Sequence, residues 1–152
     1  MIRSTTLSLA LGTALLSTPA LAGDMIQISS PHSVADTMDR LEQAVQGAGA
    51  TVFARVDHAA GAAKIDAELR PTQLLIFGNP KIGTPAMQDA QTAGLDLPLR
   101  VLAYENEAGE TVVVYHAPSS LSDAHGIDAS APYLQTMTGA LNKLTGKAVA
   151  TE

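Results

Sequence analysis

The sequence predicts one α+β domain, built on a mixed, mostly antiparallel sheet of about five strands with helices packed mainly on one face. Segments that alternate apolar and polar residues indicate strands, and segments with apolar residues three or four apart indicate helices. Residues 99–105 and 111–116 are strand-like and flank a turn-rich stretch, which predicts an antiparallel hairpin. Strands and helices follow one another without an internal repeat, and this order favours the α+β class.

The first 22 residues have the features of a removable signal peptide. A charged start at Arg3 precedes an apolar stretch, and residues 20–22 read ALA, which is an A-x-A cleavage site. The apolar stretch is far shorter than the about 20 residues that a membrane-spanning helix needs, so we expect no stable membrane anchor. We therefore expect residues 1–22 to be removed, and residues 23–152 to form a single domain in the periplasm or outside the cell.

Composition narrows the range of partners. The chain has 9 Lys and Arg against 15 Asp and Glu, a net charge of −6. Nucleic acids and anionic membranes recruit clustered basic residues, so we expect neither as a partner. The absence of Cys excludes disulfides, thiolate metal sites and Cys nucleophiles. The four His residues show neither an i, i+4 pair nor an H-x-E motif, so no metal and no cofactor is expected.

The first half of the domain predicts two strands and a helix. Residues 25–28 and 51–57 alternate in the manner of strands, and the second segment is rich in β-branched residues. Residues 59–67 are small and suit a short helix or a turn. Between the two strands we expect a helix that Ser33 caps and Gly47 ends, with an apolar face formed by Val34, Met38, Leu41 and Val45.

The middle of the chain predicts a central strand followed by a turn-rich connection. Residues 74–77 are an unbroken apolar run that suits a strand covered on both faces, so we place it in the middle of the sheet. Residues 78–83 contain Gly, Asn and Pro and predict a loop. Thr84 followed by Pro85 is typical of a helix N-terminus, and we expect that helix to run to about Thr92.

The last element is predicted to be an amphipathic helix that follows the hairpin and a looser segment, 117–129. Apolar residues recur on one helical face, as the last helix of a packed domain requires. That face consists of Leu134, Met137, Leu141 and Leu144. Gly146 and Lys147 are typical of the C-terminal end of such a helix.

Residues 74–85, which read LLIFGNPKIGTP, resemble the family catalogued as domain of unknown function 302. The resemblance extends to Met87 and residues 95–100, to residues 53–58 upstream and to residues 115–118 downstream, so it covers nearly all of residues 23–152. It implies a compact α+β fold, which is often a homodimer and sometimes follows a signal peptide. The family has no settled activity, so the resemblance implies a fold and suggests no reaction.

The loop of residues 78–84 is the first candidate for a binding site. It follows a buried strand and opens a helix, so free backbone N–H groups and Lys81 could hold a carboxylate, sulfate or phosphate. Gly78 and Gly83 have the separation found in nucleotide-binding P-loops, but the Lys that should precede Thr84 is absent. The alternative is that Gly and Pro merely shape a tight connection in which Thr84 caps the helix.

His58 is the second candidate because it follows the end of a strand, where functional loop residues often gather. It either makes a structural hydrogen bond or contacts a ligand and transfers a proton. Arg55 lies on the same strand face as Asp57 and is able to pair with it or with an anion. The predicted ligand-binding residues are Phe53, Arg55, His58, Asn79, Lys81, Gly83 and Thr84.

These residues lead to three hypotheses. The first is a non-catalytic exported accessory domain that binds a small anionic ligand or a periplasmic protein at a surface formed by Phe53, Arg55, His58 and residues 79–84. The second is a small-molecule enzyme in which His58 acts as general acid or base and loop amides hold an oxyanion. The third is a structural module whose homodimer is the functional unit. No catalytic residue set is recognisable in the sequence, so it leaves open whether the protein is an enzyme.

Overall fold

The computed structural model describes residues 25–151, and the predicted signal peptide lies outside this range. The strands are β1 (Met25–Ser30), β2 (Thr51–Asp57), β3 (Thr72–Gly78), β4 (Leu99–Glu105) and β5 (Thr111–His116). The helices are α1 (Val34–Gly47), α2 (His58–Ala63), α3 (Pro80–Asp89), α4 (Ser120–His125) and α5 (Pro132–Val149), with a 3-10 helix η1 (Gln91–Leu95). Within this range no helix is both long and apolar enough to cross a membrane.

The five strands form one sheet in the order β1-β5-β4-β3-β2, and all of their pairings are antiparallel. The predicted α+β class, strand number and antiparallel hairpin are therefore confirmed. Residues 74–77 lie in an interior strand of the sheet, as predicted, because β3 pairs with β2 on one side and with the central strand β4 on the other. Their apolar run has a cause other than the expected cover on both faces: Leu75 and Phe77 are buried under helices, whereas Leu74 and Ile76 lie half-buried on the other face.

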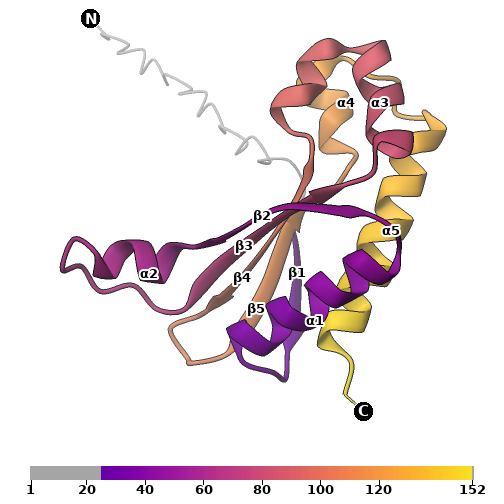
Figure 1. The fold of residues 1–152 in the computed structure, drawn as a ribbon. Helices are drawn as coiled ribbons and strands as arrows, with labels where there is room; N and C mark the ends of the chain where they lie inside the picture. The colour runs from indigo at the N-terminus through magenta and orange to yellow at the C-terminus, as the bar shows by residue number, and fades with distance from the viewer. Residues whose placement is uncertain (1–24, 152) are drawn as a thin grey trace, which may run out of the picture.

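Helices α1 and α5 cover one face of the sheet, as the sequence predicts (Figure 1). The four apolar residues expected on α1 are all buried, and so are the four expected on α5. Ser33 caps α1, because its side-chain oxygen accepts a hydrogen bond from the backbone N–H of Asp36. The main core forms where these two helices meet buried side chains of the sheet, among them Leu75, Val101 and Val113.

A smaller lobe lies at one end of the sheet and is made of α3, η1, α4 and the first half of α5 (Figure 1). We call it the α3 lobe. Its own core is formed by small and medium-sized side chains, namely Ala86, Ala93, Leu121, Ile127, Ala131, Leu134 and Met137. Two of its elements, η1 and α4, were not expected from the sequence. Both are short, and such short helices depend on packing against the rest of the fold rather than on their own propensity.

The start of α3 differs from the prediction. The helix begins at Pro80 rather than Pro85, because the side chain of Asn79 caps it by accepting a hydrogen bond from the N–H of Lys81 (3.0 Å). Pro80 occupies the first helical position, where the missing N–H costs nothing. Pro85 therefore lies inside the helix, and Thr84 is a helical residue and does not cap it.

At the opposite end of the sheet, β2, α2 and the loop to β3 form an arm that projects from the body (Figure 1). The predicted short helix is present as α2, and none of its residues is buried. Asp57 caps α2 by accepting a hydrogen bond from the N–H of Ala60 (2.8 Å). The loop that follows exposes Ile65 (77%) and Leu69 (49%), so the arm adds little to the core of the chain.

Candidate functional site

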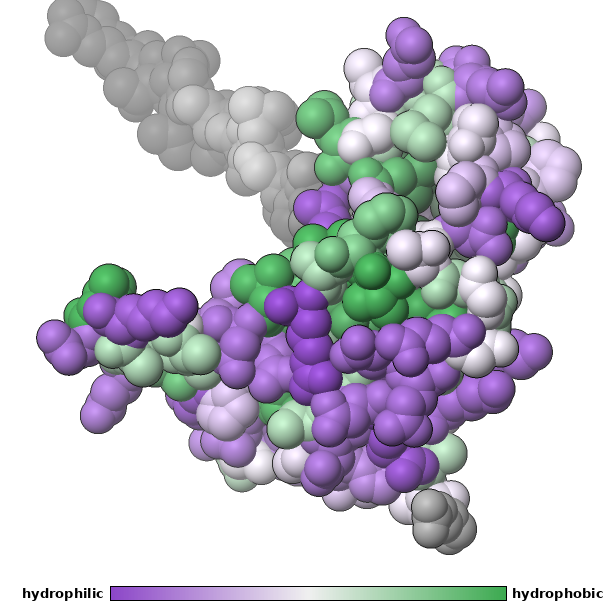
Figure 2. Space-filling view, viewed as in Figure 1, coloured by the Kyte–Doolittle hydropathy of each residue, from purple (hydrophilic) through white to green (hydrophobic). Residues whose placement is uncertain are grey.

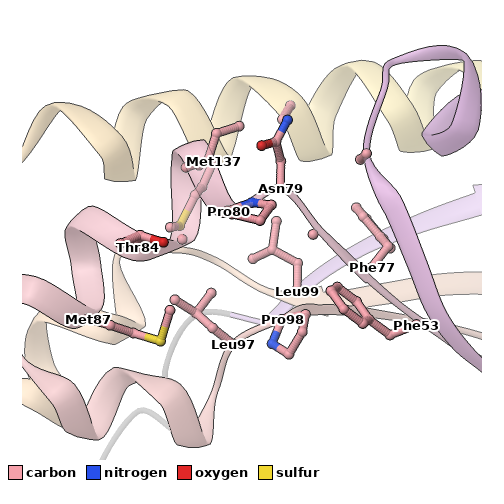
Figure 3. A pocket seen from close by; sticks show the side chains of 15 residues that line it. Phe53, Phe77, Asn79, Pro80, Thr84, Met87, Leu97, Pro98, Leu99 and Met137 are labelled. Atoms are coloured by element: carbon pink, nitrogen blue, oxygen red, sulfur yellow. The ribbon is translucent and has the colours of Figure 1, made fainter.

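An apolar pocket of about 260 Å³ lies between the α3 lobe and the end of the sheet. Figure 2 shows hydrophobic side chains gathered at this waist of the molecule, whereas the exposed face of α1 below it is hydrophilic. Side chains from β2, β3, α3, the connection before β4, and α5 meet there (Figure 3). The lining residues are Ala50, Phe53, Phe77, Gly78, Asn79, Pro80, Ile82, Gly83, Thr84, Met87, Leu97, Pro98, Leu99, Met137 and Ala140. We call this cavity the α3 pocket.

A β-bulge positions Phe53 at the pocket. In the pairing of β2 with β3, Val52 is opposite Phe77 and Ala54 is opposite Ile76, so Phe53 is the extra residue. A residue in a bulge leaves the regular alternation of the strand and can point in a new direction. Phe53 remains 57% exposed, which is unusual for Phe and leaves its surface available at the pocket mouth.

Gly78 allows the strand end to lie close to the opposite wall. A Cβ added at Gly78 would lie 3.3 Å from the Cβ of Pro98 and 3.7 Å from Cε2 of Phe53. The first of these distances is tighter than ordinary van der Waals contact, so a side chain here would displace Pro98 or narrow the pocket. Glycine at this position therefore determines the shape of the pocket, since all three residues involved line it.

The chemistry of the lining is almost entirely apolar, and it contains no ionisable side chain. Asn79 and Thr84 supply its polar side chains, and both come from the start of α3. Figure 3 shows them together with Met137 on the α3 and α5 side of the pocket, with Leu97, Pro98 and Phe53 on the other side. Such a site can hold an apolar group and orient it with one or two hydrogen bonds.

Four of the predicted site residues do meet at this pocket, namely Phe53, Asn79, Gly83 and Thr84. Arg55 is engaged elsewhere: it forms ion pairs with Asp39 and Glu42 of α1 and donates to Gln73 of β3. Burial disfavours its charge, but the hydrogen bonds and charges of Asp39 and Glu42 outweigh burial and raise the pKa of Arg55. Arg55 thus fastens α1 to the sheet and is not free to bind an anion.

His58 and Lys81 do not line the pocket. His58 is the exposed first residue of α2 and lies five residues along the chain from Phe53, which corresponds to roughly 16 Å of extended strand. The pocket lining therefore gives no support to a proton transfer from His58 to a ligand. Lys81 is exposed on the first turn of α3, and its backbone N–H is bonded to Asn79.

The expected anion-binding loop is also already satisfied by the fold. The N–H groups of Ile82 and Gly83 both bond to the carbonyl oxygen of Asn79, at 2.9 and 3.0 Å. Because Pro80 has no N–H and that of Lys81 bonds to the Asn79 side chain, the first turn of α3 has no free backbone donors for an anion. The sequence suggested such donors because residues 80–83 were expected to be loop rather than helix.

Sequence reasoning missed most of the apolar lining. Met87, Leu97 and Met137 have no local pattern that separates a pocket residue from a core residue, and Met137 was assigned to the core for that reason. The methionines have flexible, polarisable side chains that adapt to guests of different shape. Their presence at a cavity is the one signal that could have drawn attention to them.

A second cluster, also missed, joins η1, α4 and β4. His125 is 6% exposed, and its Nε2 lies 2.8 Å from Asp96 Oδ2 while its Nδ1 lies 3.0 Å from Thr92 Oγ1. The carboxylate only accepts hydrogen bonds, so Nε2 carries a proton and, in the neutral ring, Nδ1 accepts from Thr92. The hydrogen bond from His125 and the charge of Arg100, 2.8 Å away, lower the pKa of Asp96. A hydroxyl, an imidazole and a carboxylate in this order can move a proton.

Comparisons with known proteins agree with this architecture. Residues 26–144 match the model of a family described as "Domain of unknown function DUF302". A crystal structure of an uncharacterized conserved DUF302 protein from Bacillus stearothermophilus has a TM-score of 0.64, with 17% identity, and covers 82% of this chain and 94% of that one. At this identity the likeness concerns the fold alone.

Proteins named "Fluoride-specific ion channel FluC 1", from Brucella suis biovar 1 (strain 1330) and Brucella abortus biovar 1 (strain 9-941), are 41% identical to this chain over 123 residues. The match covers 78% of this chain but only 48% and 46% of those proteins. The chain thus spans about half the length of these relatives. The family match covers most of the chain and includes all the residues that build the α3 pocket. The chain belongs to the DUF302 family.

Proposed function

We propose that this protein is a binding domain that holds an apolar group in the α3 pocket and carries out no reaction on it. The observation that supports this proposal is the pocket itself: a cavity of about 260 Å³ with a nearly apolar lining, open at a waist between two parts of the fold. Cavities of about 150 Å³ bind benzene, and pockets for drug-sized molecules begin at about 300 Å³. The size therefore suits one aromatic ring with a substituent, or a medium-length alkyl chain.

The proposal replaces an anionic ligand with an apolar one. An anion in the α3 pocket would lose its hydration without meeting a cation, and that transfer is costly. Lys81 and Arg55, the cations expected at the site, lie outside the lining, and Arg55 is already paired with two carboxylates. A partner protein remains compatible with the pocket, because an apolar side chain of that partner would fill it as a small molecule does.

The test compares two glycines that both lie in helices. Gly83 lines the pocket, where an added Cβ would lie 3.9 Å from Leu97, whereas a Cβ at Gly139 on α5 would meet nothing within 4 Å. Both changes to Leu raise helix propensity by a similar amount. We expect Gly83→Leu to abolish binding of toluene, measured by calorimetry, and Gly139→Leu to bind as the wild type does. Undiminished binding in Gly83→Leu would contradict the proposed site.

The proposal includes export, which the sequence of residues 1–22 supports. Expression of the full chain in a Gram-negative host should yield a periplasmic product whose mass is that of a chain beginning at Gly23. Native mass spectrometry of that product would also reveal a co-purifying apolar ligand as an extra non-covalent mass. Recovery of the full-length chain from the cytoplasm would overturn the exported location and leave the pocket proposal unaffected.

A homodimer is part of the proposal, and the open face of the sheet supports it. Helices α1 and α5 cover only the face that carries Leu75, Val101 and Val113. The strand register places a second, mostly apolar set on the opposite face, namely Val56, Leu74, Ile76, Leu102, Tyr104 and Val112, with Arg100 beside Ile76. A sheet face of this kind packs well against another sheet face about 10 Å away, and a second copy supplies an identical one.

A second candidate function follows from the Brucella relatives. Those proteins are named fluoride-specific ion channels, and this chain matches about half of their length. The part of this chain that the structure describes has no membrane-crossing helix, so the channel of those proteins would reside in their other half. On this hypothesis the chain is a companion of a membrane fluoride channel. Deleting its gene should lower the fluoride concentration that the cells tolerate, and unchanged tolerance would contradict the hypothesis.

A further inference from the structure

The α3 pocket has two hydrogen-bond donors on one side and none on the other. Thr84 is a helical residue, yet among residues 25–151 its hydroxyl makes no side-chain hydrogen bond, whereas Thr136, Thr138 and Thr145 of α5 bond to the carbonyl four residues before them. The opposite wall consists of Phe53, Leu97 and Pro98, whose side chains have no polar atom (Figure 3). A guest of fitting shape therefore meets its polar partners at one end only.

Asn79 supplies the second donor, and its capping role determines which of its two side-chain atoms is free. Its Oδ1 accepts the N–H of Lys81 at 3.0 Å, which fixes the orientation of the amide. The Nδ2 group therefore points away from that bond, and within the described part of the chain it has no hydrogen-bond partner. Since Asn79 lines the pocket, the group that it offers to a guest is an N–H donor and not an acceptor.

We infer that the ligand is an uncharged molecule with an apolar body and one acceptor oxygen, such as the carbonyl of a ketone, ester or amide, held by Asn79 Nδ2 and Thr84 Oγ1. The apolar body fits the wall of Phe53, Leu97 and Pro98, and the acceptor oxygen is directed to the α3 side. This inference rests on the proposed function and adds the class of ligand to it. A carboxylate is disfavoured because the lining contains no cation to pair with it.

Three probes of matched shape test the inference on the purified exported protein. Acetophenone has a ring and a carbonyl, cumene has a similar size without the oxygen, and benzoate carries a charge instead. One net hydrogen bond contributes about 0.5–1.5 kcal/mol, so we expect acetophenone to bind roughly 2-fold to 10-fold more tightly than cumene, and benzoate to bind most weakly. Calorimetry or ligand-observed NMR gives the three dissociation constants.

The matched variant is Asn79→Asp. Aspartate accepts the N–H of Lys81 and caps a helix as well as asparagine does, so α3 should be retained while the donor is lost. We expect the preference for acetophenone over cumene to disappear in this variant and to be weakened in Thr84→Val. Equal affinity of the wild type for acetophenone and cumene would overturn the inference about the acceptor oxygen. It would not contradict the proposal that the pocket binds an apolar group. Binding of neither probe by the wild type would overturn the proposed function itself.

Discussion

The Nε2 atom of His125 lies 2.8 Å from Oδ2 of Asp96, and this contact joins the end of α4 to the end of η1. The imidazole is nearly excluded from solvent, whereas Asp96 is half-exposed and also pairs with Arg100. His125 holds Thr92 as well, so one side chain fastens both ends of η1. Because η1 leads into Leu97 and Pro98, this cluster positions one wall of the α3 pocket.

We expect Asp96→Asn to lower the free energy of unfolding at pH 7 by about 1 kcal/mol, the contribution of a typical hydrogen bond. The pKa of Asp96 is lowered in the folded state, so its stabilisation is present above the unfolded value of about 3.9 and is lost as the pH falls toward the folded pKa. Urea unfolding between pH 7 and pH 3 should therefore show that wild type and variant converge at the acid end. A constant difference across this range would contradict the role of the ionised carboxylate.

Arg55→Ala should destabilise the fold without changing the binding of an apolar ligand. The variant loses ion pairs to Asp39 and Glu42 and the hydrogen bonds to Gln73, and because Arg55 is only 27% exposed we expect a loss of about 1–2 kcal/mol. Lys64→Ala, at an exposed position beyond α2, is the control and should be neutral. Chemical denaturation measures both. Lost ligand binding with unchanged stability would instead support the prediction that Arg55 contacts a ligand.

Gly78→Ala should cost stability and narrow the pocket together. The new methyl group would lie 3.3 Å from the Cβ of Pro98, and overpacking of this kind costs about 1–3 kcal/mol. Gly47→Ala is the control, because a Cβ there would meet nothing within 4 Å and alanine suits the end of α1. We expect Gly78→Ala to lower both the midpoint of thermal unfolding and the affinity for toluene. Gly47→Ala should change neither quantity. Full ligand affinity in Gly78→Ala would show that this contact does not shape the pocket.

Leu74→Glu should convert the proposed dimer into a monomer, because it puts a charge on the apolar open face between Val56 and Leu102, its partners on the two neighbouring strands. Leu95→Glu is the matched control: Leu95 is 80% exposed on η1, outside that face. Light scattering coupled to gel filtration gives the mass of each species. A wild type that is monomeric at tens of micromolar, or a Leu74→Glu variant that remains dimeric, would rule out this interface.

The long helices and most strands were predictable because their signals are local. In α1 and α5 the apolar residues recur at helical spacing, and a helix with such an apolar face packs that face against a sheet whatever the rest of the fold. The four apolar residues expected on each helix are therefore buried. The hairpin of β4 and β5 follows equally from alternation and a turn. In each case the interactions that form the element lie within a few residues of one another.

The start of α3 was mispredicted because two N-terminal signals compete within seven residues. Asn79 followed by Pro80 and Thr84 followed by Pro85 each combine a capping residue with a proline that suits the first turn. The fold selects the first pair, and the helix then continues through Pro85. Packing of Ile82 against the core of the α3 lobe favours this choice, and such packing is invisible in the local sequence.

The sequence by itself determined the α+β class, the alternation of strands and helices, and the resemblance that places the chain in its family. Only the tertiary structure decided that Phe53, Met87 and Met137 share one cavity, and that Arg55 and His58 stand apart from it. The reason is physical: secondary structure follows from contacts between residues close in the sequence, whereas a pocket is a space between segments that are far apart in the sequence. That space depends on one bulge in β2, one glycine at the end of β3 and the angle at which α3 leaves the sheet.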